Sequence, residues 1–259
     1  MVVAAFRTFT AALSVSLWVL VVGPPVLIWT VVSRDPRLIY AAGSFGVRMG
    51  FALAGIKLRL EGREHLQAGA AVYACNHSSN VEPPAVFLAL RSLHPGLKVL
   101  YKAELRSLPV LVWVFDVAGF VPIERGNRDQ SFGAVDLSAA GLREGHSFVI
   151  FPEGTRSRTG ELLPFKKGGF VMAVKAQVPV VPVAVSGGRD AMRKGSPLIW
   201  PTTVTVRLTP PVPTAGLTFA DRERLVAEVR ARIHAALPHS GAAPGPGHSA
   251  KGAGRIQRL

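Results

Sequence analysis

The segment VYACNHSSNVEPPAVF, residues 72–87, leads from one apolar run through a polar turn into another. It begins inside the run AAVYAC, whose unbroken apolar character is typical of a strand buried on both faces. Pro83 and Pro84 are tolerated only in the first turn of a helix, so a helix is expected to begin near Glu82. The segment therefore predicts a buried strand, a turn and a helix, in the order that α/β proteins repeat.

Short strands and helices alternate on both sides of this segment. Strands are predicted at residues 56–62, 70–76, 97–102, 119–124, 147–154, 178–187 (broken by prolines) and 203–211. Helices are predicted at residues 81–93, 108–117, 129–142, 169–176 and 221–237. This alternation predicts an α/β sheet that is covered by helices on both faces.

The N-terminal region is apolar enough to enter a membrane. Residues 8–33 carry no charge, and a bilayer needs roughly 20 apolar residues to be crossed. Gly23-Pro24-Pro25 should kink or break a helix there, and a second apolar stretch covers residues 38–56. A single kinked transmembrane helix and a re-entrant helical hairpin both remain open. A cleaved signal peptide is disfavoured, because the apolar region is too long and no small-x-small site closes it.

The amino-acid composition limits which partners the protein is expected to bind and which kinds of site it can contain. The 259 residues carry a formal net charge of +14, which favours anionic lipid headgroups, nucleic acid or phosphorylated substrates. Aromatic residues do not interleave with the basic ones and no nucleic-acid-binding motif is present, so we expect membrane lipids and no nucleic acid. A single cysteine excludes an intramolecular disulfide and a zinc site of paired cysteines, and no metal site is expected. We expect three parts: membrane-anchoring helices at 1–54, a catalytic domain at 55–237 and a disordered basic tail at 238–259.

His77 and Glu82 are candidate catalytic residues because the chain bends between them. Residues five apart on one helix point in different directions, but here a turn separates the strand end from the helix start. A carboxylate on one imidazole nitrogen fixes the tautomer and makes the other nitrogen a better general base. A structural alternative remains, in which Asn76 and His77 satisfy turn backbone groups and Glu82 caps the helix. Cys75 is disfavoured as a nucleophile because strand alternation places it in the core.

Arginine beside glycine follows two other predicted strands. Arg125 ends GFVPIERG, and Gly154 and Arg156 lie in FPEGTRSRTG. Guanidinium groups and backbone amides together can hold a phosphate group. Lys102 and the pair Lys166-Lys167 are further candidates for phosphate or headgroup contact.

Four segments in order, NHSSNVEPP, GFVPIERG, FPEGTRS and VPVVPVAV, resemble the motifs of the 1-acylglycerol-3-phosphate acyltransferase family of glycerolipid acyltransferases. The resemblance implies a mixed, mostly parallel sheet flanked by helices, with His77 as the general base. It implies that the phosphorylated acceptor is bound by residues matching the motifs, namely Arg125, Glu153, Gly154, Thr155 and Arg156. The family's first motif usually carries aspartate where this chain has Glu82.

The expected reaction moves an acyl chain from acyl-CoA or acyl carrier protein to 1-acylglycerol 3-phosphate, without a cofactor. Because thioester donors are intracellular, the domain is expected at the cytoplasmic face of the cell membrane. Another acceptor, such as glycerol 3-phosphate or a lyso-amino-acid lipid, remains open. Two other functions also remain open: a thioesterase and a non-catalytic module that binds anionic lipid.

Overall fold

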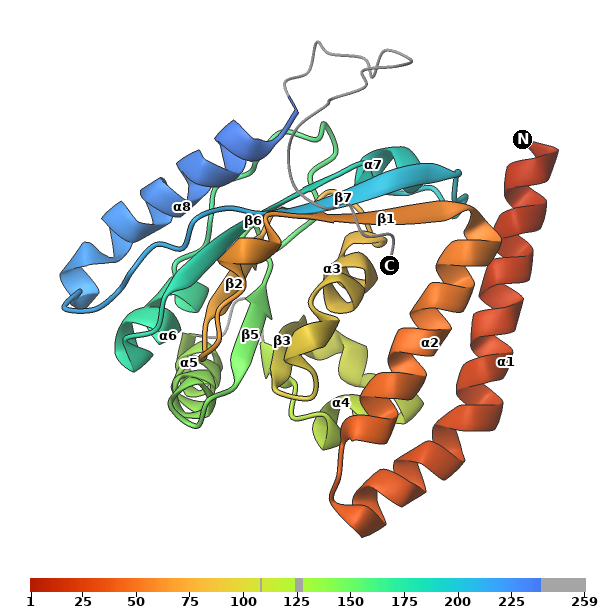
Figure 1. Ribbon diagram of the computed structural model, residues 1–259, viewed down its shortest axis with the longest axis horizontal. Coiled ribbons are helices and arrows are strands. Elements are labelled where there is room, and N and C mark those ends of the chain that lie inside the picture. Colours follow the sequence, from red (N-terminus) through yellow and green to blue (C-terminus); the bar gives the residue numbers. More distant parts are fainter. Residues whose placement is uncertain (108, 124–127, 239–259) are drawn as a thin grey trace.

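The computed structural model describes residues 1–107, 109–123 and 128–238. Seven strands form one sheet in the order β1-β7-β6-β2-β5-β3-β4 (Figure 1). Their bounds are β1 Ile56–Glu61, β2 Val72–Cys75, β3 Leu97–Lys102, β4 Val121–Ile123, β5 Ser147–Ile150, β6 Val180–Ser186 and β7 Thr202–Leu208. The predicted α/β class and the mostly parallel sheet are confirmed.

All neighbouring strands pair in parallel except β6 and β7, which are antiparallel. The strand β2 lies at the centre, between β6 and β5. The carboxyl ends of β6, β2, β5, β3 and β4 therefore meet at one edge of the sheet. Ligand sites of open α/β sheets lie at such an edge.

Helices cover both faces of the sheet (Figure 1). They are α1 Val2–Ser33, α2 Arg37–Ala54, α3 Glu82–Ala89, α4 Pro109–Val117, α5 Arg128–Arg143, α6 Gly168–Ala176, α7 Gly188–Ala191 and α8 Arg222–Ala236. Residues of β2 alternate between two buried clusters: Val72 and Ala74 pack with α5, α6 and α8, whereas Tyr73 and Cys75 pack with α3. This alternation explains why β2 is apolar at every position.

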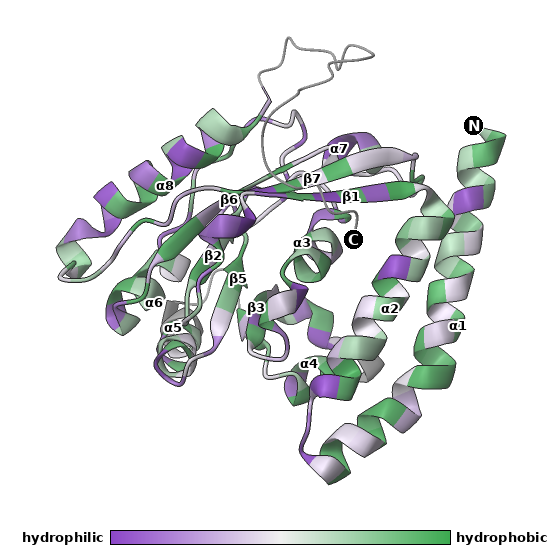
Figure 2. Cartoon of the chain, viewed as in Figure 1, coloured by the Kyte–Doolittle hydropathy of each residue, from purple (hydrophilic) through white to green (hydrophobic). Residues whose placement is uncertain are grey.

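The first two helices form an antiparallel hairpin beside the sheet (Figure 1). The Trp18 indole N–H donates to the Ala42 carbonyl oxygen at 3.1 Å, and its ring lies 4.4 Å from that of Phe45. Pro24 and Pro25 lie inside α1, which changes direction in its second half instead of ending there. Figure 2 shows that α1 is largely hydrophobic along its length. It is long and apolar enough to cross a membrane, and only 11% of its most apolar window is buried.

Two predicted elements differ from the structure. The helix expected at 81–93 ends at Ala89, and a separate 3₁₀ turn covers Arg91–Leu93. His94 is extended because Pro95 follows it, which prevents the helix from continuing. The strand expected to break at its prolines runs through Pro182 without interruption. From residue 239 the predicted tail lies outside the described residues, as does the first residue of the helix expected at 108–117.

Candidate active site

His77 lies two residues after the end of β2, at the carboxyl edge, and α3 begins at Glu82 as the proline pair predicts. The imidazole Nδ1 and the Glu82 Oε2 are 3.0 Å apart, so the predicted pairing is confirmed. A carboxylate only accepts hydrogen bonds, so Nδ1 carries a proton, and in the neutral imidazole Nε2 is the nitrogen with the lone pair. The dyad thus has the tautomer that a general base requires.

Glu82 is held by two further donors from the turn. The Ser78 backbone N–H donates to Oε2 at 2.7 Å, and the Ser78 hydroxyl donates to Oε1 at 2.5 Å. The Glu82 side chain has no exposed surface, whereas that of His77 keeps 15% exposed. A substrate can therefore reach the imidazole of His77 but not the carboxylate of Glu82.

The backbone of His77 is fixed independently of its ring. Its N–H donates to Glu153 Oε1 at 2.7 Å, and the Ser157 N–H donates to its carbonyl oxygen at 2.7 Å. The second Glu153 oxygen accepts from the Leu163 N–H at 3.1 Å. The pKa of Glu153 is raised to about 7, chiefly by burial and in smaller part by the charge of Glu82, although the His77 and Leu163 N–H groups and Arg230 lower it. Glu153 therefore connects the β5 loop to the histidine.

Cys75 is fully buried beside the site. Burial first, and then the charge of Glu82, raise the pKa of its thiol well above the ordinary value. A thiol that resists ionisation is a poor nucleophile. This agrees with the core position expected from strand alternation.

The loop after β5 carries cations and contacts the backbone of His77 through the Ser157 N–H. Gly154 has φ +68°, and the aliphatic end of Lys166 lies where a side chain at 154 would point. Lys194 Nζ donates to the Arg156 carbonyl oxygen at 2.8 Å and lies 3.3 Å from the Thr155 hydroxyl. These contacts bring the segment after β6 against the predicted phosphate loop.

Cations in these two segments are not neutralised by neighbouring carboxylates. Within the described ranges, no Asp or Glu oxygen lies within 4.0 Å of the charged groups of Arg156, Arg158, Lys166, Arg189, Arg193 and Lys194. Positive charge that no carboxylate neutralises attracts anions from solution. The edge of the sheet beside His77 is therefore suited to a phosphate group.

The other predicted phosphate ligands are less closely placed. Lys102 ends β3, separated from β2 by β5, and pairs with Glu104 at 2.9 Å. Lys167 pairs with Glu223 of α8 at 2.5 Å. Arg125 lies outside the described residues. The structure thus brings together the dyad and the 153–156 loop, whereas Lys102 makes no described contact with either.

Sequence reasoning missed Ser78, Gly188 and the basic segment containing Arg189 and Lys194. The segment GGRDAMRKG follows the fourth motif directly, and its basic residues were a visible signal. Contacts of Ser78 and Gly188 with Glu82 depend on side-chain placement in three dimensions, which no local pattern reveals.

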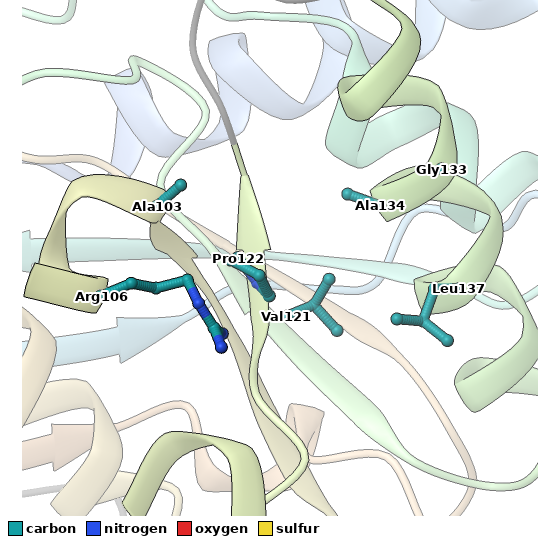
Figure 3. Close-up of a pocket in the computed structure, with 7 residues that line it drawn as sticks. All are labelled: Ala103, Arg106, Val121, Pro122, Gly133, Ala134 and Leu137. Carbon is teal, nitrogen blue, oxygen red and sulfur yellow. The ribbon is translucent and has the colours of Figure 1, made fainter. Parts of the chain in front are cut away.

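A separate pocket of about 370 Å³ lies beside β4 (Figure 3). Leu137 of α5 points toward Val121 of β4 across it, and Arg106 borders it on the other side of the strand. β5 and β3 separate this pocket from β2, so it is not part of the dyad. Within residues 1–107, 109–123 and 128–238, no group of three or more His, Cys, Asp or Glu side chains is placed to hold a metal ion.

Known proteins share the fold and part of the sequence of this chain. A solved structure, the 1-acyl-sn-glycerophosphate (LPA) acyltransferase PlsC from Thermotoga maritima, superposes with a TM-score of 0.74 at 24% identity. It covers 91% of this chain and 97% of that chain, which shows a shared fold.

Curated relatives include a 1-acyl-sn-glycerol-3-phosphate acyltransferase from Cocos nucifera, 33% identical over 64% of this chain and 53% of that protein. A putative 1-acyl-sn-glycerol-3-phosphate acyltransferase, acl-2, from Caenorhabditis elegans is 34% identical over 66% of this chain and 61% of that protein. The chain therefore spans between half and two thirds of the length of these relatives. The acyltransferase family model matches residues 57–186, which is half of the chain, so the chain belongs to the acyltransferase family.

Proposed function

We propose that the protein transfers an acyl chain from an acyl thioester to the free hydroxyl of 1-acylglycerol 3-phosphate, giving phosphatidic acid. The observation that carries this proposal is the His77–Glu82 dyad beside cations that have no described carboxylate partner. The acceptor hydroxyl needs a base that removes its proton, and the phosphate monoester of the acceptor needs cations that bind it. Relatives at 33% and 34% identity are named as a 1-acyl-sn-glycerol-3-phosphate acyltransferase and a putative one.

In the proposed mechanism, His77 Nε2 accepts the proton of the acceptor hydroxyl. The oxygen attacks the thioester carbonyl, the new C–O bond forms and the C–S bond breaks. The imidazolium then gives its proton to the leaving thiolate, which restores the neutral base. Glu82 stabilises the imidazolium through Nδ1–H, at a distance of 3.0 Å. Such general base catalysis contributes roughly 10²- to 10⁴-fold in rate.

The acceptor phosphate is proposed to bind Gly154, Thr155 and Arg156, with Arg125 and Lys102 as further contacts. Arg156 offers a planar fork of donors that matches phosphate oxygens. Glu153 contributes indirectly, because both of its oxygens accept backbone N–H groups. Its role is to hold His77 and the phosphate loop in one arrangement.

The α1–α2 hairpin is proposed to embed in the cell membrane, with the site on the cytoplasmic face. A lipid acceptor with one acyl chain partitions into the bilayer, so an enzyme that uses it benefits from a membrane-bound position. The donor is acyl-CoA or acyl carrier protein, both of which are water-soluble and intracellular.

The test is a panel assay on purified protein in detergent or vesicles. Acyl-CoA and acyl carrier protein are offered in turn with 1-acylglycerol 3-phosphate, glycerol 3-phosphate and a lyso-amino-acid lipid, and free thiol and product are measured. The proposal expects thiol release that depends on 1-acylglycerol 3-phosphate and equals the phosphatidic acid formed. Thiol release without an acceptor, or a clear preference for another acceptor, would contradict it.

A further inference from the structure

The Glu82 side chain lies in a closely fitted site. An ideal Cβ added to Gly188 would lie 2.6 Å from Glu82 Oε1, 2.7 Å from Cγ and 3.1 Å from Cδ. Distances below 3.0 Å are essentially never found for real Cβ atoms. Glu82 therefore occupies the space that any side chain at position 188 would need.

The backbone conformation does not account for glycine at position 188. Its neighbour Gly187 has φ +78°, and a Cβ there would lie 2.2 Å from the Thr203 carbonyl oxygen, so Gly187 is required by the backbone. Gly188 has no such left-handed φ, and its three nearest contacts are all atoms of Glu82. The fit to Glu82 is the structural reason for this glycine.

The backbone at 188 is also held in place. The Met192 N–H donates to the Gly188 carbonyl oxygen at 3.0 Å, and the Ser79 hydroxyl donates to the Met192 carbonyl oxygen at 2.7 Å. Asn76 exchanges two hydrogen bonds with the Val185 backbone, at 2.7 and 2.9 Å. Hydrogen bonds thus connect the backbone of α7 and the end of β6 to the turn that carries His77. Because the backbone is held in this way, it does not move away from a methyl group added at position 188.

We propose that Gly188 and Ser78 are positioning residues that hold the Glu82 carboxylate against His77. Ser78 supplies two of the three hydrogen bonds to that carboxylate, and Gly188 leaves room for the Glu82 side chain. This inference rests on the proposed role of the dyad in acyl transfer. It assigns the placement of the Glu82 carboxylate to residues of the β2–α3 turn and of α7.

The test compares kcat, KM for both substrates and melting temperature for the full-length protein and its variants. Gly188→Ala should lower kcat at least about tenfold while KM stays within about twofold, because a small displacement of a catalytic group is costly. Gly69→Ala is the matched control, since a Cβ at Gly69 meets nothing within 4 Å. In a Glu82→Ala background, where the clash is absent, adding Gly188→Ala should change kcat less than about twofold.

Ser78 provides a second and independent test. Ser78→Ala should lower kcat with little change in KM, and Ser78→Thr should recover most of the loss because it retains the hydroxyl. If Gly188→Ala fails to fold, the two Ser78 variants still test whether the Glu82 carboxylate must be held in place for turnover. A normal kcat for Gly188→Ala or Ser78→Ala, or an equal loss from Gly188→Ala in the Glu82→Ala background, would overturn the proposal.

A measurement without turnover separates this inference from the proposed function. Nitrogen NMR of His77 should show the Nδ1-protonated tautomer in the wild-type protein and a tautomer mixture in Gly188→Ala. If the wild-type protein transfers no acyl chain, the proposed function fails, but this comparison still tests the positioning. The same single tautomer in both proteins would contradict the role of Gly188.

Discussion

At the residue scale, the site depends on fixing one imidazole by separate contacts. Glu82 orients the His77 ring through Nδ1, and Glu153 holds the His77 backbone through its N–H. The two carboxylates differ in environment. Glu82 accepts hydrogen bonds from the hydroxyl and the backbone N–H of Ser78, whereas Glu153 accepts hydrogen bonds from two backbone N–H groups. Substitution of either acid should therefore have a distinct effect.

The first prediction concerns Glu153 and pH. Burial raises its pKa from an ordinary 4.5 to about 7, so between these values the folded protein retains a proton that the unfolded chain releases. Raising the pH through this window should therefore lower the free energy of unfolding, by up to about 3 kcal/mol for this group. Below pH 4.5 the contribution is fully present. Denaturant unfolding at several pH values measures it, with Glu153→Gln as the control that cannot titrate.

The difference in unfolding free energy between wild type and Glu153→Gln should fall across this window, because all other titrating groups are shared. Parallel stability curves for the two proteins between pH 4.5 and 7 would show that Glu153 does not titrate there.

The sequence predicted the His77–Glu82 pair because the pair Pro83-Pro84 fixes where the helix begins. It did not predict the contact between Glu153 and the His77 backbone. That contact requires the loop after β5 to return to its strand, where the Lys166 N–H donates to the Pro152 carbonyl oxygen at 2.7 Å. Such long-range closure leaves no periodic pattern in the sequence.

At the element scale, the segments after β5 and β6 support each other. Arg189 Nε donates to the Arg158 carbonyl oxygen at 3.2 Å, and Lys194 Nζ donates to that of Arg156 at 2.8 Å. These bonds use backbone oxygens of the loop and leave the Arg156 guanidinium available to a ligand. The predicted phosphate loop is thus shaped by a segment that the four motifs do not include.

The second prediction tests Arg156 as a phosphate ligand. Arg156→Ala should raise KM for 1-acylglycerol 3-phosphate about tenfold to hundredfold, the effect of losing a charge-assisted hydrogen bond. KM for the thioester should stay nearly constant. The control is Arg91→Ala, an exposed arginine before the amino end of β3. Equal KM values for Arg156→Ala and wild type would remove Arg156 from the acceptor site.

Alternation of strands and helices could be predicted because buried strands and amphipathic helices have distinct periodicities. The strand expected at 203–211 is β7, but its antiparallel direction could not be predicted, since nothing local to Thr202–Leu208 specifies that direction or its place between β1 and β6. The helix α7 was also missed, because four residues are too few to show a helical period.

At the scale of the whole molecule, the hairpin and the site meet at the same edge of the sheet. α2 ends at Ala54, and Ile56 of β1 pairs with Thr202 at the beginning of β7. Since β7 is antiparallel to β6, this beginning lies at the carboxyl edge of β6. The Ile199 N–H also donates to the Thr8 hydroxyl of α1 at 2.8 Å. A membrane that surrounds this end of the hairpin would therefore lie near the dyad.

The third prediction concerns membrane binding. The protein should float with lipid vesicles even at roughly 1 M salt. Salt screens the attraction between its basic surface and anionic lipid, but it does not screen apolar contact with the bilayer. Leu20→Glu in α1 should weaken binding at high salt. Leu137→Glu in α5 is the matched control, since these two leucines are 64% and 61% exposed. Equal flotation of both variants would contradict insertion of α1.

The most direct test of the whole account measures acyl transfer by His77→Ala beside wild type, with acyl-CoA and 1-acylglycerol 3-phosphate, following thiol and phosphatidic acid together. His234→Ala, an exposed histidine of α8, is the control. The account predicts a fall in kcat of about 10²- to 10⁴-fold for His77→Ala, with an unchanged melting temperature and normal activity for the control. A His77→Ala protein that retains kcat within about threefold of wild type would contradict the role of His77 as the base.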